Sequence, residues 1–230
     1  MPLAHVGGRP RQIEATDIVR VGRDLGMRDL SLSAVAAALG VSTTALYRHV
    51  DGRWGLERLV GESLLADLHL VDDPDHDTPR HLVSFGLQLH GFAVRHPGLA
   101  AYLQTLFPRG SGGEQLLRDE VAALRRRGYT ADTALVLCGA VASLSIGLAA
   151  AADAQREHAE GLGEQQQQVL TRLLGHAELG DPHRALPEVV HTDYVRLVLT
   201  AAIRGLVDAA PPGRPVPAIV AALSADGEDN

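Results

Sequence analysis

Apolar residues recur at helical spacing along most of the chain, and polar or Gly- and Pro-containing stretches separate one periodic segment from the next. Near the N-terminus Ala15, Ile18, Val19 and Leu25 form one apolar stripe, which predicts a helix over residues 12–25 with Gly26 directly after it. Nowhere do β-branched and polar residues alternate with a period of two. The pattern therefore predicts an all-α fold.

The same spacing predicts the remaining helices, and Pro97 supplies one of the boundaries because proline cannot continue a helix. An acidic loop is expected over residues 71–79 and a second loop over residues 108–113. We expect residues 155–163 to be mobile and the Pro-rich tail from Pro211 to fray. The further predicted helices are residues 54–70, 80–96, 98–107, 114–127, 131–154, 165–176 and 188–209.

Residues 32–49, which read LSAVAAALGVSTTALYRH, have the pattern of a helix-turn-helix. Ala36 precedes Gly40 by four positions, so a small side chain lets two helices cross closely and a glycine accepts the positive φ of a tight turn. Ser42 is placed to cap the second helix with its side-chain oxygen. That helix, predicted over residues 43–50, would enter the major groove of DNA.

The spacing alone also fits an ordinary helical hairpin, and the side chains of the second helix decide between the two. Thr43, Thr44, Tyr47, Arg48 and His49 are polar groups suited to hydrogen bonding, where a structural hairpin more often has Glu, Lys or Gln. This composition favours a helix that reads DNA.

Residues 12–65 resemble the N-terminal domain of TetR-family transcriptional regulators, and LGVSTTALYRHV matches the family's recognition helix. The family usually has a basic Lys shortly after the His. This chain contains no lysine and has Arg53 there. The resemblance implies that Thr43, Thr44 and Ala45 face base edges. It also implies that Tyr47, His49 and Arg53 bind the DNA backbone. Arg48 would reach a base or a phosphate, and Ser42 would lie next to these DNA-contacting residues.

A short basic arm, residues 8–11, precedes the first helix. Arg9 and Arg11 can lie in a narrow, electronegative minor groove, although a disordered terminus is the alternative. Residues 1–53 hold seven Arg and five acidic residues, net +2, whereas residues 54–230 hold 14 Arg and 23 acidic residues, net −9. A mildly basic end on an acidic protein suits a site-specific regulator better than a protein that coats DNA.

The length of 230 residues corresponds to one or two domains. We expect a DNA-binding domain over residues 1–53, an effector-binding and dimerisation domain over residues 54–210, and a tail over residues 211–230. Hydrophobic residues make up 46% and aromatic residues 3%, so the core should be aliphatic. The single cysteine excludes an internal disulfide, and the first ten residues lack the apolar core of a signal peptide. A cytoplasmic protein is expected.

Residues 133–152 carry no charge and are long enough to raise the alternative of a membrane span. Ser and Gly interrupt the run, Asp132 and Asp153 flank it, and no basic cluster sets an orientation. A helix that is apolar all round is more simply a helix buried on several sides.

The resemblance implies a homodimer whose interface is a four-helix bundle formed by residues 131–154 and 188–209 and their copies. Gly139, Ser143 and Gly147 would permit close packing there, and packing within one chain is the alternative. Two recognition helices in a dimer read two half-sites, so the operator should be near-palindromic.

The resemblance also implies an effector site among the middle helices. A largely apolar small molecule is expected, whose binding releases the DNA. Two polar residues, Gln88 and His90, are candidate anchors for it. The apolar candidates, each of which can instead be plain core, are Phe85, Leu89, Phe92, Tyr102, Leu106, Phe107, Leu137 and Val141.

Residues 69–81 are rich in His and Asp, which allows the alternative of a metal-dependent hydrolase. The spacing lacks helical i, i+4 geometry and fits a solvated loop better. No nucleophile-elbow, phosphate-loop or HExxH motif is present. Cys138 is expected to be a small, buried apolar residue. We therefore expect a regulator with no catalytic residues, metal or cofactor, and leave open whether it represses or activates and whether it needs a ligand.

Overall fold

The computed structural model describes residues 13–106, 110–187 and 190–228. Every regular element within these ranges is an α-helix, which confirms the predicted all-α fold. The helices are α1 (Ala15–Asp29), α2 (Leu32–Leu39), α3 (Thr43–Leu46), α4 (Gly52–Leu65), α5 (Thr78–Arg95), α6 (Leu99–Leu106), α7 (Ser111–Arg126), α8 (Ala131–Leu174), α9 (Gly180–Ala185), α10 (His191–Ala209) and α11 (Val216–Glu228).

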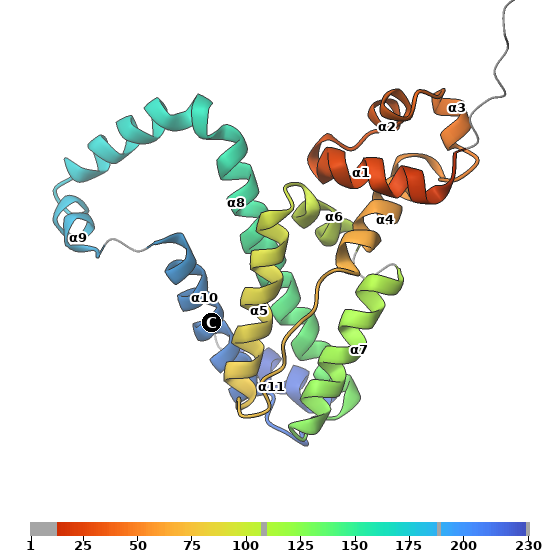
Figure 1. Cartoon of the computed structure of the whole chain (residues 1–230). Coiled ribbons are helices and arrows are strands. Elements are labelled where there is room, and N and C mark those ends of the chain that lie inside the picture. The colour runs from red at the N-terminus through yellow and green to blue at the C-terminus, as the bar shows by residue number, and fades with distance from the viewer. Residues whose placement is uncertain (1–12, 107–109, 188–189, 229–230) are drawn as a thin grey trace, which may run out of the picture.

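Helices α1 to α3 gather with the start of α4 at one end of the molecule, and α4 leads from there into a larger bundle (Figure 1). In that bundle α8 packs against α5, α6 and α7, while α10 packs against α5 and α8. The most extensive helix pairing is between α5 and α8. The long apolar helix of the sequence is thus the centre of the larger bundle.

The small N-terminal unit has an aliphatic core of its own. Ile18 of α1, Val35 of α2, Leu46 of α3, and Leu56 and Val60 of α4 are fully buried. Burying a side chain of this size contributes roughly 1.5–3 kcal/mol each. This core fixes α2 and α3 against α1, and therefore fixes what the unit presents to solvent.

The prediction that Gly26 directly follows the first helix is confirmed: Gly26 has a non-helical backbone with φ 77°, and the part of α1 up to Asp29 is a second helical segment beyond this kink. Two other local predictions in this unit need correction. The second helix of the helix-turn-helix is shorter than residues 43–50, because α3 ends at Leu46 and a turn follows it. The Ser42 side chain makes no capping hydrogen bond, and its carbonyl oxygen accepts from the Ala45 N–H at 3.0 Å instead.

The prediction of a mobile segment over residues 155–163 is also wrong. Helix α8 runs without a break through this segment. Ala, Glu, Gln, Arg and Leu dominate it, and these are good helix formers whose preference offsets the cost of about 1 kcal/mol for each of Gly161 and Gly163. The outer part of α8 and α9 project from the bundle as an arm, residues 155–187 (Figure 1).

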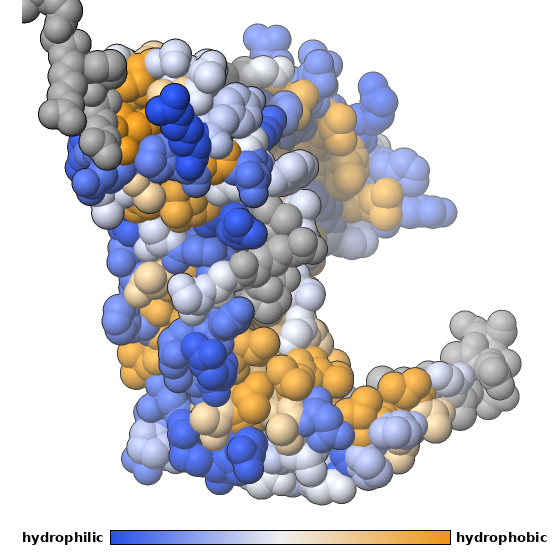
Figure 2. Space-filling model, turned by 90° about the vertical axis from the view of Figure 1, so that its right-hand side faces the viewer, coloured by the Kyte–Doolittle hydropathy of each residue, from blue (hydrophilic) through white to orange (hydrophobic). Residues whose placement is uncertain are grey.

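The tail after Pro211 is helical rather than frayed. Helix α11 contacts α8 and α10, and Ile219 is buried between them and the rest of the core. The Thr133 hydroxyl donates a hydrogen bond to the carbonyl oxygen of Arg214 at 3.1 Å and fixes the turn that leads into α11. In Figure 2 the outer part of α11 projects from the body at lower right, and Val220 on this helix is exposed.

Among the residues that the structure describes, one segment, Ala131–Ala159 of α8, is long and apolar enough to cross a membrane by length and composition. The core helix of a bundle has the same properties, and this segment packs against α5, α6, α7 and α10. Burial in the bundle accounts for part of this apolar character, because 44% of the most apolar window of the segment is buried.

Candidate nucleic-acid interface and effector-binding region

The turn between α2 and α3 has the predicted geometry. Gly40 adopts the left-handed conformation with φ 68°, as predicted, and a Cβ there would meet no other atom, so the positive φ alone favours glycine. The Gly40 N–H donates to the Ala37 carbonyl and the Val41 N–H donates to the Ala36 carbonyl at 3.0 Å. Ala36 is buried where α2 lies close to its neighbours. These bonds end α2 and set the direction of α3.

Around α3 the polar candidates point to solvent while the apolar ones hold the helix in place. Leu46 and Val50 are buried, and Ala45 is half-buried. Tyr47 is a large aromatic side chain that is 57% exposed. The remaining candidates of this stretch are all exposed: Ser42, Thr43, Thr44, Arg48 and His49.

The three predicted arginine contacts outside the helix-turn-helix differ in what the structure shows. Arg53 is 74% exposed, and its Nε donates to Glu57 Oε1 at 2.7 Å. An exposed pair one helical turn apart is worth only about 0.3–0.5 kcal/mol, so Arg53 remains free to bind a phosphate. Arg9 and Arg11 lie outside the described residues.

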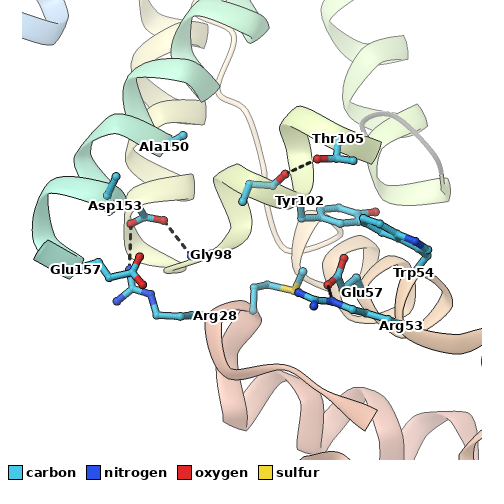
Figure 3. Close-up of a pocket in the computed structure, with 13 residues that line it drawn as sticks. Arg28, Arg53, Trp54, Glu57, Gly98, Tyr102, Thr105, Ala150, Asp153 and Glu157 are labelled. Carbon is cyan, nitrogen blue, oxygen red and sulfur yellow. Dashed lines mark hydrogen bonds and ion pairs between the residues drawn. The ribbon is translucent and has the colours of Figure 1, made fainter.

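A polar junction connects the N-terminal unit to the bundle. Asp153 of α8 is buried and accepts hydrogen bonds from the Gly98 N–H at 2.9 Å and from Arg156 Nη2 at 2.7 Å. Its other near neighbour is Arg28 of α1, whose Nη2 lies 3.9 Å from Asp153 Oδ1. The Arg28 N–H also donates to the Pro97 carbonyl. Asp153 thereby joins α1, α8 and the start of α6 (Figure 3).

The junction encloses a pocket of about 410 Å³ between the two parts of the molecule. Arg53 and the exposed Trp54, both from the start of α4, lie on one side of it, with Tyr102 of α6 close to Trp54 (Figure 3). The segment that carries the candidate phosphate contact Arg53 is therefore in direct reach of α6 and α8.

A second contact joins α4 to α6 and α7. The Tyr102 hydroxyl donates to Glu62 Oε1 at 2.8 Å, and the Gly113 N–H donates to Glu62 Oε2 at 3.0 Å. A Cβ at Gly110 would lie 2.4 Å from the Glu62 side chain, and a Cβ at Gly112 would lie 2.7 Å from the Glu62 backbone oxygen. The start of α7 therefore approaches α4 more closely than a side chain at either position permits. Tyr102, an expected effector contact, is thus engaged with α4.

Only part of the expected effector site comes together around one space. Phe85 and Leu89 of α5 line a small cavity of about 30 Å³, called the inner cavity below. Phe92, Leu137 and Val141 are buried elsewhere in the core, and the Phe92 ring packs on His96 at a centroid distance of 4.3 Å. The Leu106 side chain and all of Phe107 are outside the part of the chain that the structure describes.

Neither expected polar anchor lines the inner cavity. The Gln88 side chain binds the backbone of Val71, accepting from its N–H at 2.8 Å and donating to its carbonyl at 3.1 Å, and so holds the loop before α5. Gln88 also borders a surface groove of about 500 Å³ between α5 and α10. The His90 ring lies 5.9 Å from that of His191, and burial lowers the pKa of His90.

Sequence reasoning missed a buried charge cluster beside the inner cavity. His81 of α5 places Nδ1 3.0 Å from Asp72 Oδ1 and Nε2 3.0 Å from Glu120 Oε2 of α7. The Arg127 guanidinium donates to Asp72 at 2.6 Å and holds the pKa of that carboxyl well below its usual range, assisted by Arg126. The only signal in the sequence was the density of His and Asp over residues 69–81, which the metal hypothesis used.

The alternative of a metal-dependent hydrolase gains no support from this cluster. Asp72 and His81 are engaged in ion pairs, and among the described residues no group of three or more His, Cys, Asp or Glu side chains is arranged to hold a metal ion.

No protein-family model matches the chain. Its fold matches solved structures over almost its whole length. Apo ActR from Streptomyces coelicolor superposes with a TM-score of 0.73 at 17% identity, covering 87% of this chain and 97% of that one. The TetR family protein ActR in complex with actinorhodin gives 0.73 at 21%, covering 89% and 100%. A TetR variant from Acinetobacter baumannii in complex with minocycline gives 0.60 at 17%, covering 84% and 95%.

Sequence relatives match a shorter stretch. The nucleoid occlusion factor SlmA of Shewanella pealeana is 35% identical over 78 residues, which cover 32% of this chain and 40% of that protein. SlmA of Escherichia coli is 33% identical over 82 residues, covering 34% and 41%. The chain thus spans about two fifths of the length of these curated relatives, and the likeness along the whole chain is one of fold.

Proposed function

From the all-helical fold that this chain shares with TetR-family regulators, and from the helix-turn-helix at its N-terminal end, we propose that it is a dimeric transcriptional repressor. In this proposal it binds a near-palindromic operator and is released by a small, largely apolar effector. The observation that carries the proposal is the exposed polar surface around α3, set on a buried aliphatic core.

In the proposed complex, α3 enters the major groove. Thr43, Thr44 and Ala45 lie at its N-terminal end, where hydroxyl and methyl groups can meet base edges. Exposed Tyr47 and Arg48, which follow directly, contact the DNA backbone or the next base. His49 and Arg53 bind phosphates, Ser42 flanks them, and Arg9 and Arg11 enter the adjacent minor groove.

A second copy of the chain would cover an apolar face that the single chain leaves exposed. One face of α10 carries Tyr194 and Leu197 on successive turns, and Val190 directly precedes the helix on the same face. These three side chains are 52–66% exposed. On α8, Leu135 and Val136 are exposed, and at Gly139 and Gly147 an added Cβ would meet nothing in this chain. Large exposed apolar side chains beside small residues favour close helix pairing between subunits.

Effector binding would act on DNA affinity through the contacts between the bundle and α1 and α4. Asp153 links α8 to Arg28, and Glu62 links α4 to Tyr102 and the start of α7. A ligand that moves α6, α7 or α8 would change both links, and couplings of this kind are typically about 1–3 kcal/mol. The structures of ActR with actinorhodin and of the Acinetobacter TetR variant with minocycline support a small-molecule effector.

The proposed division of labour places DNA binding in residues 1–53 and effector binding and dimerisation in residues 54–210. Because α11 packs on α8 and α10, the tail over residues 211–230 belongs with the second part. The proposed site of action is the cytoplasm, where the operator is, and the proposal assigns no enzymatic reaction.

The experiment that tests this function is selection of bound sequences from a random DNA duplex library with the purified full chain at physiological salt. Enrichment of a near-palindromic consensus, with half-sites about one helical turn apart, is the expected result. A library that shows no enrichment contradicts the proposal of a site-specific regulator.

A further inference from the structure

The groove of about 500 Å³ between α5 and α10 is lined by three arginines, and none of the described residues that line it is acidic. Its volume is typical of a small-molecule site. Arg80 comes from the first turn of α5, and Arg196 and Arg204 come from α10. This space is called the α5–α10 groove below. Its other lining residues are His76, Pro79, Val83, Ser84, Leu87, Gln88 and Thr200.

The three arginines have no partner among the residues that the structure describes. All three are exposed, and their guanidinium groups form no ion pair or hydrogen bond there. Acidic residues are not scarce, because residues 54–230 hold 23 of them and 14 arginines. Elsewhere in the bundle Arg127 pairs with Asp72 and Arg156 pairs with Asp153. The groove therefore collects unpaired positive charge in a part of the chain that is acidic as a whole.

The acidic residues at the α5 end of the groove are engaged with other groups. The Asp77 carboxylate accepts a hydrogen bond from the backbone N–H of Arg80 at 3.0 Å and caps α5. Asp73 Oδ2 lies 3.5 Å from His76 Nε2. The other ring nitrogen of His76, Nδ1, is buried and has no hydrogen-bond partner among the described residues. The lining of the groove thus includes a further polar group that the protein leaves unsatisfied.

The α10 side of the groove is one strip of that helix. Arg196, Thr200 and Arg204 are four positions apart, so they lie on successive turns, and the two arginines are separated by about 12 Å along the helix. Asp193 and Asp208 lie one turn beyond the two ends of the strip, and neither lines the groove or forms an ion pair with a described residue. The strip also differs from the apolar face proposed for the dimer.

The α5 side of the groove is amphipathic. Val83 and Leu87 lie one turn apart and are half-buried, so they offer apolar surface. Ser84 and Gln88 follow them in the chain, and the Gln88 amide donates a hydrogen bond to the Ser84 hydroxyl at 3.1 Å. An apolar wall opposite a strip of guanidinium groups suits a molecule that has an apolar body and an anionic group.

We propose that the α5–α10 groove is a binding site for a small organic anion, whose carboxylate or phosphate group is held by the arginines and whose apolar body packs on Val83 and Leu87. Guanidinium groups present paired N–H donors that match both kinds of anionic group. A cleft lined by charges of one sign also raises the local concentration of the opposite ion. The inference does not depend on the proposed function, and the groove shares only Gln88 with the residues expected to contact the effector.

The test uses three probes with the same aromatic body: 2-naphthyl phosphate, 2-naphthoate and 2-naphthol. Their binding to the full-length wild-type protein is measured by isothermal titration calorimetry at pH 7.5, without DNA. Both anions are expected to bind at least about tenfold more tightly than the neutral alcohol, because hydrogen bonds to charged groups are the stronger ones. Added salt should weaken the binding of the anions and leave that of the alcohol unchanged.

The double variant Arg196→Gln with Arg204→Gln removes two charges and keeps polar side chains of similar length. It is expected to lose at least about tenfold in affinity for both anions and to change little for the alcohol. Arg80→Gln is a second, independent variant with the same expected direction. Arg172→Gln is the matched control, because Arg172 is an exposed arginine near the end of α8 that forms no ion pair with a described residue and lies outside the groove.

Equal affinity for the three probes, no binding of any of them, or full anion affinity in the double variant and in Arg80→Gln would each overturn the inference. The same loss in Arg172→Gln would also overturn it, because the effect would then come from net charge alone. The order of phosphate and carboxylate identifies the anionic group, and either order supports the site. The DNA selection described above tests the proposed function separately, since these titrations contain no DNA.

Discussion

Asp153 of α8 and Arg28 of α1 are 125 positions apart in the sequence, yet their side chains lie 3.9 Å apart across the junction of the two parts of the molecule. Gly98 stands between them at φ 86°, where a Cβ would lie 2.5 Å from the Arg28 nitrogen. The central helix of the bundle is therefore anchored to the N-terminal unit at a point where only glycine fits.

Asp153→Ala should lower the free energy of unfolding by about 1–3 kcal/mol, because it leaves the half-buried Gly98 N–H without its acceptor. Arg28→Ala should cost less than about 1 kcal/mol, since its side chain is 38% exposed and the pair is long. Urea unfolding of both single variants and the double variant measures these values. A larger loss for Arg28→Ala than for Asp153→Ala would contradict the assigned order.

Gly112→Ala should destabilise the protein by about 1–3 kcal/mol, because the new Cβ would lie 2.7 Å from the backbone oxygen of Glu62 and force α7 away from α4. Gly163→Ala is the matched control. It lies in the α8 arm, where the new methyl meets nothing, and a helical alanine should stabilise by up to about 1 kcal/mol. Thermal unfolding distinguishes the two, and similar melting temperatures would refute the close approach.

Because of Asp72, we expect the free energy of unfolding to decrease at acidic pH. Its pKa is lowered in the folded state, chiefly by Arg127, so its contribution is fully present above the unfolded-state pKa of about 3.9. That contribution falls as the pH drops below this value toward the folded-state pKa. Urea unfolding between pH 7 and pH 2.5 should show the fall in the wild type.

Asp72→Asn provides the comparison for that measurement. It should reduce the stability at pH 7 by about 1–2 kcal/mol, because two guanidinium groups lose a charged partner. Its stability should also fall less steeply on acidification. If the free energy of unfolding falls with the same slope in wild type and variant as the pH is lowered, Asp72 does not titrate as stated.

Arg48→Ala and Tyr47→Ala should each abolish measurable operator binding while they leave the fold and the dimer intact, because both side chains are exposed. Arg118→Ala, a substitution of an exposed arginine on α7, is the control and should bind normally. Fluorescence anisotropy over a range of salt concentrations gives the affinities. Full affinity in both variants would refute the recognition-helix assignment.

Leu197→Arg should convert the proposed dimer to a folded monomer and reduce operator affinity at least about tenfold, because a charge would replace an apolar side chain that is 64% exposed in the single chain. Val71→Arg, at an equally exposed apolar position in a loop outside α8 and α10, should remain dimeric. Sedimentation velocity measures the mass. A dimeric Leu197→Arg protein would place the interface elsewhere.

The sequence by itself determined the features that depend on neighbouring residues. Helical periodicity predicted the all-α fold and most helix positions, and the step from Ala36 to Gly40 predicted the turn of the helix-turn-helix, because a tight turn is a local requirement. Local signals were insufficient where they conflict. Residues 155–163 were expected to be mobile, yet α8 continues through them, and the Pro-rich tail was expected to fray, yet it forms α11.

The tertiary structure alone decided which polar groups meet. Gln88 and His90 were plausible anchors from their position in α5, but Gln88 holds a loop and His90 packs beside His191, while Glu120 of another helix borders the inner cavity. Glu62 with Tyr102 likewise joins residues 40 positions apart. Such pairs depend on how the helices cross, and a helical pattern fixes which face is buried but not which partner that face meets.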